Sequence, residues 1–283
     1  MLVSGQTLLD EAVRGGYAIG SFNTYNLEIT RAILAAAEAR RSAVFLAVGS
    51  GALDYGGFAP LTQLVLAAAR EATVPVAVHL DHSPTVADCE RCLSEGFTSL
   101  MIDGSNLPFD ENVALTWQTV KRAGEIPVEG ELGGVGGDED SSGAQETAIP
   151  MTDPAQARAF VEQTGVASLA IAIGNAHGIY KGEPKLDFDR LAALRDAVPA
   201  PLVLHGASGL SDDDLRRAIS LGVRKINVNT EIRQTLFGSL DRSLEQGVKG
   251  YDVTRLFGVA MEAMQRTVEE KIEVFSGSPS FSS

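Results

Sequence analysis

The chain has 283 residues, of which 45% are hydrophobic and 21% are charged, and its formal net charge is −14. This is the composition of a globular protein with a large core, and an acidic chain without a basic stripe argues against nucleic-acid binding. The longest apolar run, Val166–Ile173, has the length of a strand and falls short of the roughly 18–20 residues of a membrane span. The N-terminus shows no basic segment followed by an apolar one, so we expect no signal peptide and a cytoplasmic location.

Short apolar runs alternate with helical patterns along the chain. Several of the runs are apolar throughout, which favours parallel strands buried on both faces. The predicted strands are Ala18–Asn23, Ala43–Val48, Val74–Leu80, Ser99–Ile102, Val128–Leu132, Ser168–Ile173, Leu202–His205 and Lys225–Val228. The predicted helices are Leu27–Arg40, Leu61–Glu71, Thr85–Glu95, Glu111–Ala123, Pro154–Gln163, Phe188–Val198, Asp212–Ser220, Glu231–Gln246 and Val253–Val274.

Eight strands that alternate with helices predict an α/β fold, the (β/α)8 TIM barrel, with one extra C-terminal helix. We expect a single domain over residues 1–283, with a flexible tail at 276–283. A doubly wound sheet is the alternative, but no G-x-G-x-x-G motif lies between the first strand and helix to support it.

Helix start signals support several of these boundaries. Ser83 and Asp153 each stand directly before a proline, which suits the first position of a helix. Ser211 precedes three aspartates, and acidic residues are favourable at a helix N-terminus. We therefore expect helices to begin at these three places.

Polar residues gather at the carboxyl ends of the predicted strands, and in a barrel these ends converge on one mouth, where active sites of this fold lie. The residues concerned are Asn23, Asp81, His82, Asp103, Glu129, Glu131, His177, His205, Asn227 and Asn229. Three of the four histidines are among them, and three imidazoles with an open position form a catalytic zinc site. The sequence therefore predicts a metal held by His82, His177 and His205, whereas His79, inside the third strand, is interpreted as a core or supporting residue.

The neighbours Asp81 and His82 raise a geometric question. Strict alternation along a strand would send their side chains to opposite faces. Both can reach one site if the strand ends there and the pleat breaks, and Ser83-Pro84 makes that break plausible.

Glycine-rich segments follow the sixth and seventh strands, at Asn175–Gly178 and His205–Gly209, and the eighth strand runs through Asn227–Thr230 into a helix. Glycines let backbone amides approach an anion closely, and phosphate sites at the loops after strands seven and eight recur in this fold. Simple turn glycines are the alternative. Because the set lies beside two of the histidines, we favour a phosphate site.

Two acidic residues are candidates for proton transfer. Asp81 adjoins a predicted metal ligand, and Glu139 lies in the long loop Gly133–Pro150, from which it could reach the substrate. The alternative for the acidic run at 138–140 is a solvated turn. A metal with two such acids suits chemistry beside a carbonyl, in which the metal polarises the carbonyl and holds the enediolate.

The chain resembles the class II ketose-bisphosphate aldolases along nearly its whole length. The resemblance is carried by YAIGSFN, HLDHS, GFTSLMIDGS, VEGELGGVGGDED, DPAQARAFVEQTGVASLAIAIGNAHGIYKGEP, LVLHGASG and GVRKINVNTE. Within the family it looks nearer to the tagatose-bisphosphate and short fructose-bisphosphate type than to the longer fructose-bisphosphate type.

The resemblance implies an enzyme that reversibly cleaves fructose or tagatose 1,6-bisphosphate to dihydroxyacetone phosphate and glyceraldehyde 3-phosphate. It implies catalytic zinc on the three histidines, second-shell or alternate-metal carboxylates, and a monovalent cation (Na⁺ or K⁺) near the phosphate. In this reading Asp81 protonates the aldehyde oxygen in condensation and removes the C4 hydroxyl proton in cleavage, while Glu139 exchanges the proton at the dihydroxyacetone phosphate carbon. The implied carboxylates are Asp103 and Glu131, and the implied substrate-binding residues are Asn23, Gly178, Gly206, Ala207, Ser208, Asn227, Val228, Asn229 and Thr230. The resemblance also implies a homodimer or homotetramer, to which the two long C-terminal helices could contribute.

Four positions depart from the family pattern. Gly49 stands where many fructose-type members have a serine that touches substrate, and Met261 where some have an arginine for the second phosphate. Ser83 replaces a common glycine or histidine, and Gly130 replaces the usual alanine between two glutamates. These departures leave the aldol chemistry in place and the identity of the aldehyde open.

The sequence leaves three other functions open. A close alternative is an aldolase for another phosphorylated ketose or ketoacid, such as the 5-dehydro-2-deoxyphosphogluconate type. A non-catalytic sugar-phosphate-binding protein is a second alternative, against which the retention of Asp81, Glu139 and the three histidines argues. A metallohydrolase on the same barrel is a third.

Overall fold

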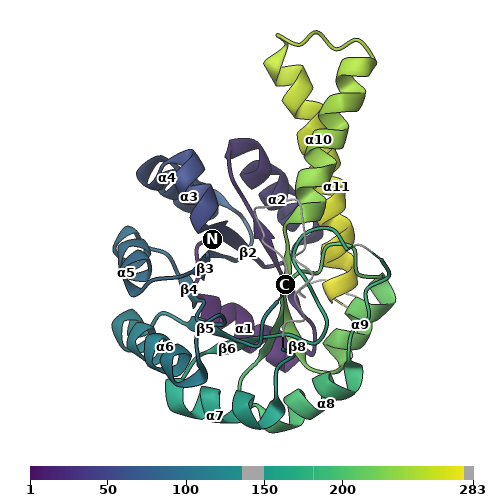
Figure 1. The fold of residues 1–283 in the computed structure, drawn as a ribbon. Helices are drawn as coiled ribbons and strands as arrows, with labels where there is room; N and C mark the ends of the chain where they lie inside the picture. Colours follow the sequence, from purple (N-terminus) through teal and green to yellow (C-terminus); the bar gives the residue numbers. More distant parts are fainter. Residues whose placement is uncertain (136–149, 181, 277–283) are drawn as a thin grey trace.

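The computed structural model describes residues 1–135, 150–180 and 182–276. Eight parallel strands form a closed barrel in which each strand pairs with its neighbours in chain order and β1 pairs with β8 (Figure 1). The strands are β1 (Ile19–Asn23), β2 (Val44–Gly49), β3 (Val76–Ser83), β4 (Ser99–Ile102), β5 (Val128–Leu132), β6 (Ser168–Ile171), β7 (Leu202–Leu204) and β8 (Val223–Val228). The predicted (β/α)8 barrel is confirmed.

Helices surround the barrel and follow its strands. They are α1 (Gly5–Gly15), α2 (Leu27–Arg40), α3 (Ser50–Gly56), α4 (Phe58–Glu71), α5 (Val86–Glu95), α6 (Phe109–Ala123), α7 (Pro154–Thr164), α8 (Phe188–Ala197), α9 (Asp212–Ser220), α10 (Thr230–Glu245) and α11 (Val253–Ser276). The bounds predicted for α2 and α9 are correct, and the sequence reading did not predict α1 and α3.

Two of the three predicted caps are confirmed. Asp153 accepts from the amides of Ala155 and Gln156, and Ser211 accepts from the amide of Asp214. The prediction for Ser83 is wrong: it is the last residue of β3, and Thr85 caps α5 by accepting from the amide of Asp88.

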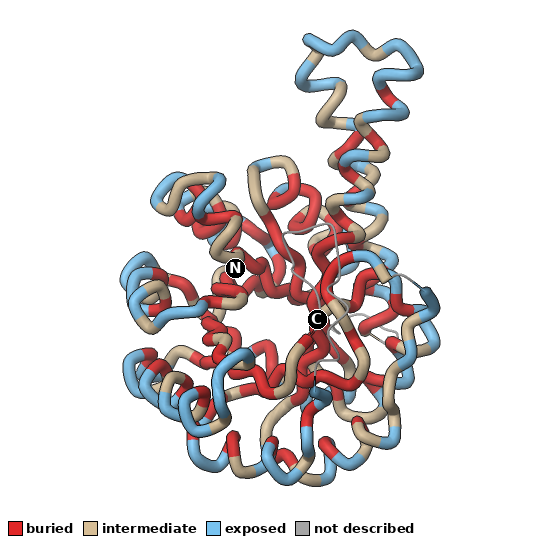
Figure 2. Tube along the Cα trace, in the orientation of Figure 1, coloured by how far each residue is buried: buried red, intermediate tan, exposed pale blue. Residues whose placement is uncertain are grey.

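Helix α1 closes the end of the barrel at which the strands begin. Its buried residues Leu8, Leu9 and Ala12 form one cluster with the first residues of three strands, among them Ile19 and Ala77. The strands themselves are buried on both faces, and exposed residues concentrate on the outer helices (Figure 2). The other end of the barrel is therefore the one left for a site.

Helices α10 and α11 extend beyond the barrel as an antiparallel arm (Figure 1). At its base α11 returns to the barrel, where Phe275 stacks on Phe22 of β1 with ring centroids 6.5 Å apart. In the part of the chain that the structure describes, no helix has both the length and the apolar character needed to cross a membrane.

Candidate active site

A β-bulge near the end of β3 brings Asp81 and His82 to the same site. Between Leu80 and Ser83 the register of β3 against β4 shifts, because three steps along β3 match two along β4. His82 takes the left-handed conformation, with φ 46°. An extra residue in one strand re-aims the side chains beside it. The strand therefore continues past both residues, and the bulge, rather than the expected strand end, breaks the pleat.

The three predicted histidines converge at the mouth of the barrel. Each offers a ring nitrogen, and these nitrogens lie within 4.8 Å of one another. The ring centroid of His82 lies 4.9 Å from that of His177 and 4.6 Å from that of His205. Residues from β3 and from the loops after β6 and β7 thus meet as the strand-end argument predicted.

Carboxylates hold one ring nitrogen of each of two of these histidines. His82 Nδ1 lies 2.9 Å from Asp103 Oδ2, and His205 Nε2 lies 2.8 Å from Glu129 Oε1. Burial acts to raise the pKa of both carboxyls, but their contacts with His82, His205 and Lys225 lower it, so both are carboxylates that accept. The other two ring nitrogens, His82 Nε2 and His205 Nδ1, form a hydrogen bond with each other at 2.9 Å. Carboxylates that hold ligand histidines in this way are typical of metal sites, and the donor set fits zinc.

Asp103 and Glu131 form a second group of potential ligand atoms with His82, again within 4.8 Å of one another. Glu131 is buried, and its Oε2 has no hydrogen-bond partner among the described residues. Burial, together with the nearby charge of Asp103, raises the pKa of Glu131 to about 8. A cation at this place would favour the ionised carboxylate and lower that pKa, as expected of a group that can serve as an alternate ligand.

Asp81 is completely buried, and two amides hold its carboxylate. Asn23 donates to Oδ2 at 2.8 Å and Asn227 donates to Oδ1 at 3.1 Å. Burial by itself raises the pKa of Asp81, but the electrostatic interactions with His82, His205 and Lys225 outweigh it, and the pKa is lowered. The group is therefore an oriented carboxylate beside the three histidines.

A cavity of about 200 Å³ lies between the loops after β6 and β7 and the start of α10. Three of the predicted substrate-binding residues line it: Gly178, Ser208 and Thr230. Tyr180, also in its wall, accepts from the amide of Ala176 at 2.9 Å and donates to the carbonyl of Gly206 at 2.8 Å. One hydroxyl thus joins the two loops.

Gly206 has φ +64°, and a Cβ there would lie 2.2 Å from the carbonyl oxygen of Ala176. Only glycine fits, because the conformation is left-handed and the backbone of the loop after β6 passes directly over it. The close approach holds the amide of Ala207 at the floor of the loop, where it donates to the carbonyl of Asn227 at 3.2 Å.

The start of α10 borders the same cavity. Asn229 is the N-cap residue but makes no capping hydrogen bond with its side chain, which instead pairs with the hydroxyl of Tyr25 at 2.9 Å. The amide of Glu231 donates to Ser208 Oγ at 3.2 Å. The first turn of a helix carries partial positive charge, so this end favours an anion. Val228 is fully buried in the core, which leaves only its backbone for a ligand.

The sequence reading did not identify several residues that support the site. Lys225 contacts Glu129 at 2.9 Å inside the barrel, and Tyr25 and Tyr180 hold loop residues by their hydroxyls. The position of Lys225 two residues before Asn227, on the same face of one strand, was the available signal. Glu139 lies outside the described residues.

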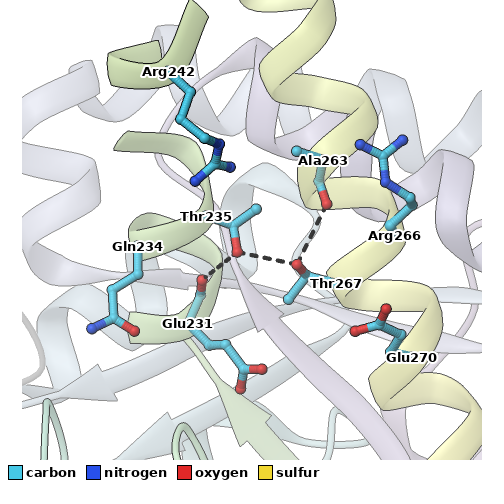
Figure 3. Close-up of a pocket in the computed structure, with 8 residues that line it drawn as sticks. All are labelled: Glu231, Gln234, Thr235, Arg242, Ala263, Arg266, Thr267 and Glu270. Carbon is cyan, nitrogen blue, oxygen red and sulfur yellow. Dashed lines mark hydrogen bonds between the residues drawn. The ribbon is translucent and has the colours of Figure 1, made fainter. Parts of the chain in front are cut away.

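A groove of about 460 Å³ lies between α10 and α11, and none of the three histidines lines it (Figure 3). Two arginines and two glutamates line it, and its threonine hydroxyls are engaged: Thr235 with the carbonyl of Glu231, and Thr267 with Thr235 and the carbonyl of Ala263. Mixed charge and occupied hydroxyls make it a weaker candidate than the barrel mouth.

The converging imidazoles and the held carboxylate at the open end of a (β/α)8 barrel define an enzyme site. Residues 3–279 match the model of the class-II fructose-bisphosphate aldolase family, and the chain belongs to that family. It is therefore a lyase.

Relatives that align over nearly the whole chain support the same family. The chain is 42% identical to the fructose-bisphosphate aldolase of Thermus caldophilus over 97% of this chain and 98% of the relative. It is 44% identical to that of Geobacillus stearothermophilus over 98% of each. Among solved structures, the YdjI aldolase of Escherichia coli K12 superimposes with a TM-score of 0.86 at 38% identity, with 97% of each chain covered.

Proposed function

We propose that the protein reversibly cleaves a ketose 1,6-bisphosphate, with fructose 1,6-bisphosphate as the first candidate, to dihydroxyacetone phosphate and glyceraldehyde 3-phosphate. The observation that carries the proposal is the buried carboxylate of Asp81, held by Asn23 and Asn227 beside three converging histidines. The relatives named fructose-bisphosphate aldolase support this substrate.

His82, His177 and His205 are the proposed ligands of a zinc ion, with Asp103 and Glu131 as supporting or alternate ligands. Zinc would supply a Lewis acid that polarises the ketose carbonyl and stabilises negative charge on it. Burial lowers the pKa of His205, which favours the neutral imidazole that a metal requires. A monovalent cation near the phosphate is part of the same proposal.

Asp81 is the proposed acid and base of the carbon–carbon bond step. In cleavage its carboxylate takes the proton of the C4 hydroxyl as the C3–C4 bond breaks, and the electron pair of that bond passes to C3. In condensation the same proton returns to the aldehyde oxygen. Asn23 and Asn227 keep the carboxylate in one orientation, and Asn23 is also a proposed substrate contact. Glu139 is the proposed partner for proton exchange at C3 of dihydroxyacetone phosphate.

The cavity beside these residues is the proposed site of the dihydroxyacetone phosphate group. Backbone amides and hydroxyls, together with the N-terminal end of α10, would offset the formal charge of −14 locally. The residues proposed to contribute are Gly178, Gly206, Ala207, Ser208, Asn227, Val228, Asn229 and Thr230.

The test is an assay of purified protein against fructose 1,6-bisphosphate, tagatose 1,6-bisphosphate and a phosphorylated 2-deoxyketoacid. We expect zinc-dependent release of dihydroxyacetone phosphate from at least one of the two bisphosphates. No release from either, with turnover of the ketoacid phosphate, would replace the proposed substrate. No turnover of any of them, with tight binding of dihydroxyacetone phosphate, would favour a binding protein.

We also propose a homodimer or homotetramer built with the α10–α11 arm. Large apolar side chains on the arm are exposed, among them Phe237 at 63% and Tyr251 at 76%. Light scattering coupled to size exclusion gives the mass in solution, and a monomer would overturn this part of the proposal.

A further inference from the structure

A column of buried polar side chains runs down the inside of the barrel beneath the three histidines. Glu129 contacts His205 at 2.8 Å and Lys225 at 2.9 Å, Lys225 reaches His79 at 3.3 Å, and His79 contacts Ser99 at 2.8 Å. These residues come from β5, β7–α9, β8, β3 and β4, and none is more than 4% exposed. The proposed mechanism uses only the top of this column.

Burial of the charged side chains in this column costs folding free energy. A buried lysine and glutamate lose their hydration, and a well-packed apolar pair of the same volume is often as stable or more stable. The interior around them is apolar: Phe45, whose ring centroid lies 5.6 Å from Lys225 Nζ, and the small cluster of Met101, Ala170 and Val203. An ion pair in such a place indicates a positioning role.

The two carboxylate oxygens of Glu129 have different partners. Oε2 accepts from Lys225 Nζ and from Ser168 Oγ at 3.4 Å, so that Oε1 is turned toward His205 Nε2. Since Oε1 accepts, Nε2 of His205 carries the proton, and its Nδ1 presents a lone pair toward His82. The position of Lys225 thus decides which way Glu129 points and which nitrogen of His205 is available.

We propose that Lys225 and Glu129 are positioning residues, which orient His205 as a metal ligand from inside the barrel. The inference rests on the proposed metal site. Lys225 does not act on substrate, because its ammonium is buried below the histidines and engaged with Glu129 and His79.

The experiment measures metal binding rather than turnover. The zinc dissociation constant is obtained by competition with a chromophoric chelator, and the visible spectrum of the cobalt(II) protein reports ligand geometry. Lys225→Met leaves Glu129 without its partner, and we expect about 10- to 100-fold weaker zinc binding and an altered cobalt spectrum, as is typical when outer-shell partners of a ligand are lost. Lys225→Arg, which keeps a cationic donor, retains more of the affinity than Lys225→Met.

A double variant and a control variant complete the test. Lys225→Met combined with Glu129→Met removes both charges, so that no buried charge is left unpaired, and it should show the same loss of zinc affinity. Lys271→Met is the matched control, since it breaks a lysine–glutamate pair of 3.1 Å between α11 and α10, outside the barrel, and should leave zinc binding unchanged.

Thermal unfolding of each metal-free protein separates loss of folding from loss of orientation. Zinc affinity within twofold of the parent protein and an unchanged cobalt spectrum in the double variant would overturn the inference. Failure of the parent protein itself to bind zinc would instead refute the proposed metal site, and the inference with it.

Discussion

His82 and His205 approach the barrel mouth from opposite sides, with Nε2 of one 2.9 Å from Nδ1 of the other. The far nitrogen of each ring is occupied by a carboxylate, Asp103 for His82 and Glu129 for His205. Two ring nitrogens this close, each on an imidazole held by a carboxylate, can ligate one shared cation. Dialysis against a strong chelator should therefore reduce activity at least 1,000-fold, on the order expected for loss of a Lewis acid worth several kcal/mol, and zinc should restore it.

Zinc binding at His82 and His205 should also stabilise the folded protein. Zinc at about 1,000 times its dissociation constant should stabilise the fold by about 4 kcal/mol, and His205→Ala should remove most of that gain. Calorimetric scans with and without zinc measure it. Full activity in excess chelator, with a borohydride-trapped Schiff base on a lysine, would contradict a metal mechanism.

Asp81→Asn keeps the shape of the side chain but removes its ability to take a proton. General acid–base groups contribute about 10²- to 10⁴-fold, so kcat should fall by that factor. Zinc affinity should change little, because Asp81 is not one of the proposed zinc ligands and its carboxylate accepts from the amides of Asn23 and Asn227. Steady-state kinetics with a parallel zinc titration distinguishes the two effects, and unchanged turnover would remove Asp81 from the mechanism.

Much of the fold could be predicted because strands and helices alternate regularly along the chain. Strands buried on both faces read as apolar runs, and glycines and capping residues separate them from amphipathic helices, so that α2 and α9 are correct to the residue. Helix α1 was missed because it precedes the first strand, where the strand–helix alternation gives no place for it. Helix α3 has only seven residues, too few for a helical period to be visible.

The site was predictable to the extent that it lies at strand ends. That rule brought His82, His177 and His205 together, since all strands of a parallel barrel end at one mouth. It could not place Lys225, because the role of a lysine within an apolar strand becomes visible only when β5, which does not pair with β8, supplies Glu129 inside the barrel. The bulge at Asp81 and His82 was equally hidden, since a register shift depends on the pairing of β3 with β4 and not on either strand alone.

Tyr180→Phe should weaken binding of the phosphate group. The hydroxyl accepts from the amide of Ala176 and donates to the carbonyl of Gly206, and its loss leaves both backbone groups without that partner, at a cost of about 1–3 kcal/mol. We expect KM for the bisphosphate to rise about 10-fold or more, with a smaller change in kcat.

The matched control for this variant is Tyr251→Phe, in the exposed arm. Calorimetric titration with dihydroxyacetone phosphate should show weaker binding in Tyr180→Phe alone. Equal binding by the two variants would show that the loops keep their geometry without the hydroxyl.

His79 predicts a pH dependence of stability. Burial, with the charge of Lys225 adding to it, lowers the pKa of His79 from 6.5 to about 3, so the folded protein keeps it neutral while the unfolded chain takes up a proton below pH 6.5. The stability contributed by the neutral imidazole is complete above pH 6.5 and is lost as the pH falls toward 3. Between pH 7 and pH 5 the loss should be about 2 kcal/mol.

His79→Gln removes the titrating group and keeps a polar side chain. The difference in unfolding free energy between the parent protein and His79→Gln, from urea titrations at pH 7 and pH 5, should therefore shift by about 2 kcal/mol in favour of the variant at the lower pH. A difference that is constant with pH would mean that His79 does not stay neutral in the fold.

A substitution at Gly49 should change the preference between fructose and tagatose 1,6-bisphosphate. It pairs with Asp81 across β2 and β3, and a Cβ at Gly49 would meet nothing closer than the carbonyl oxygen of Asp81 at 3.9 Å. Its φ is −83°, and it is the N-cap residue of α3, where serine is preferred over glycine by a few tenths of a kcal/mol. Gly49→Ser should therefore fold with unchanged or slightly higher stability and place a hydroxyl near Asp81.

One added hydrogen bond is worth about 1 kcal/mol, so in Gly49→Ser kcat/KM for fructose 1,6-bisphosphate relative to its tagatose epimer should rise about fivefold. Gly49→Ala, which adds the carbon without the hydroxyl, should leave that ratio unchanged, and an equal change in both variants would mean that volume and not hydrogen bonding distinguishes the epimers.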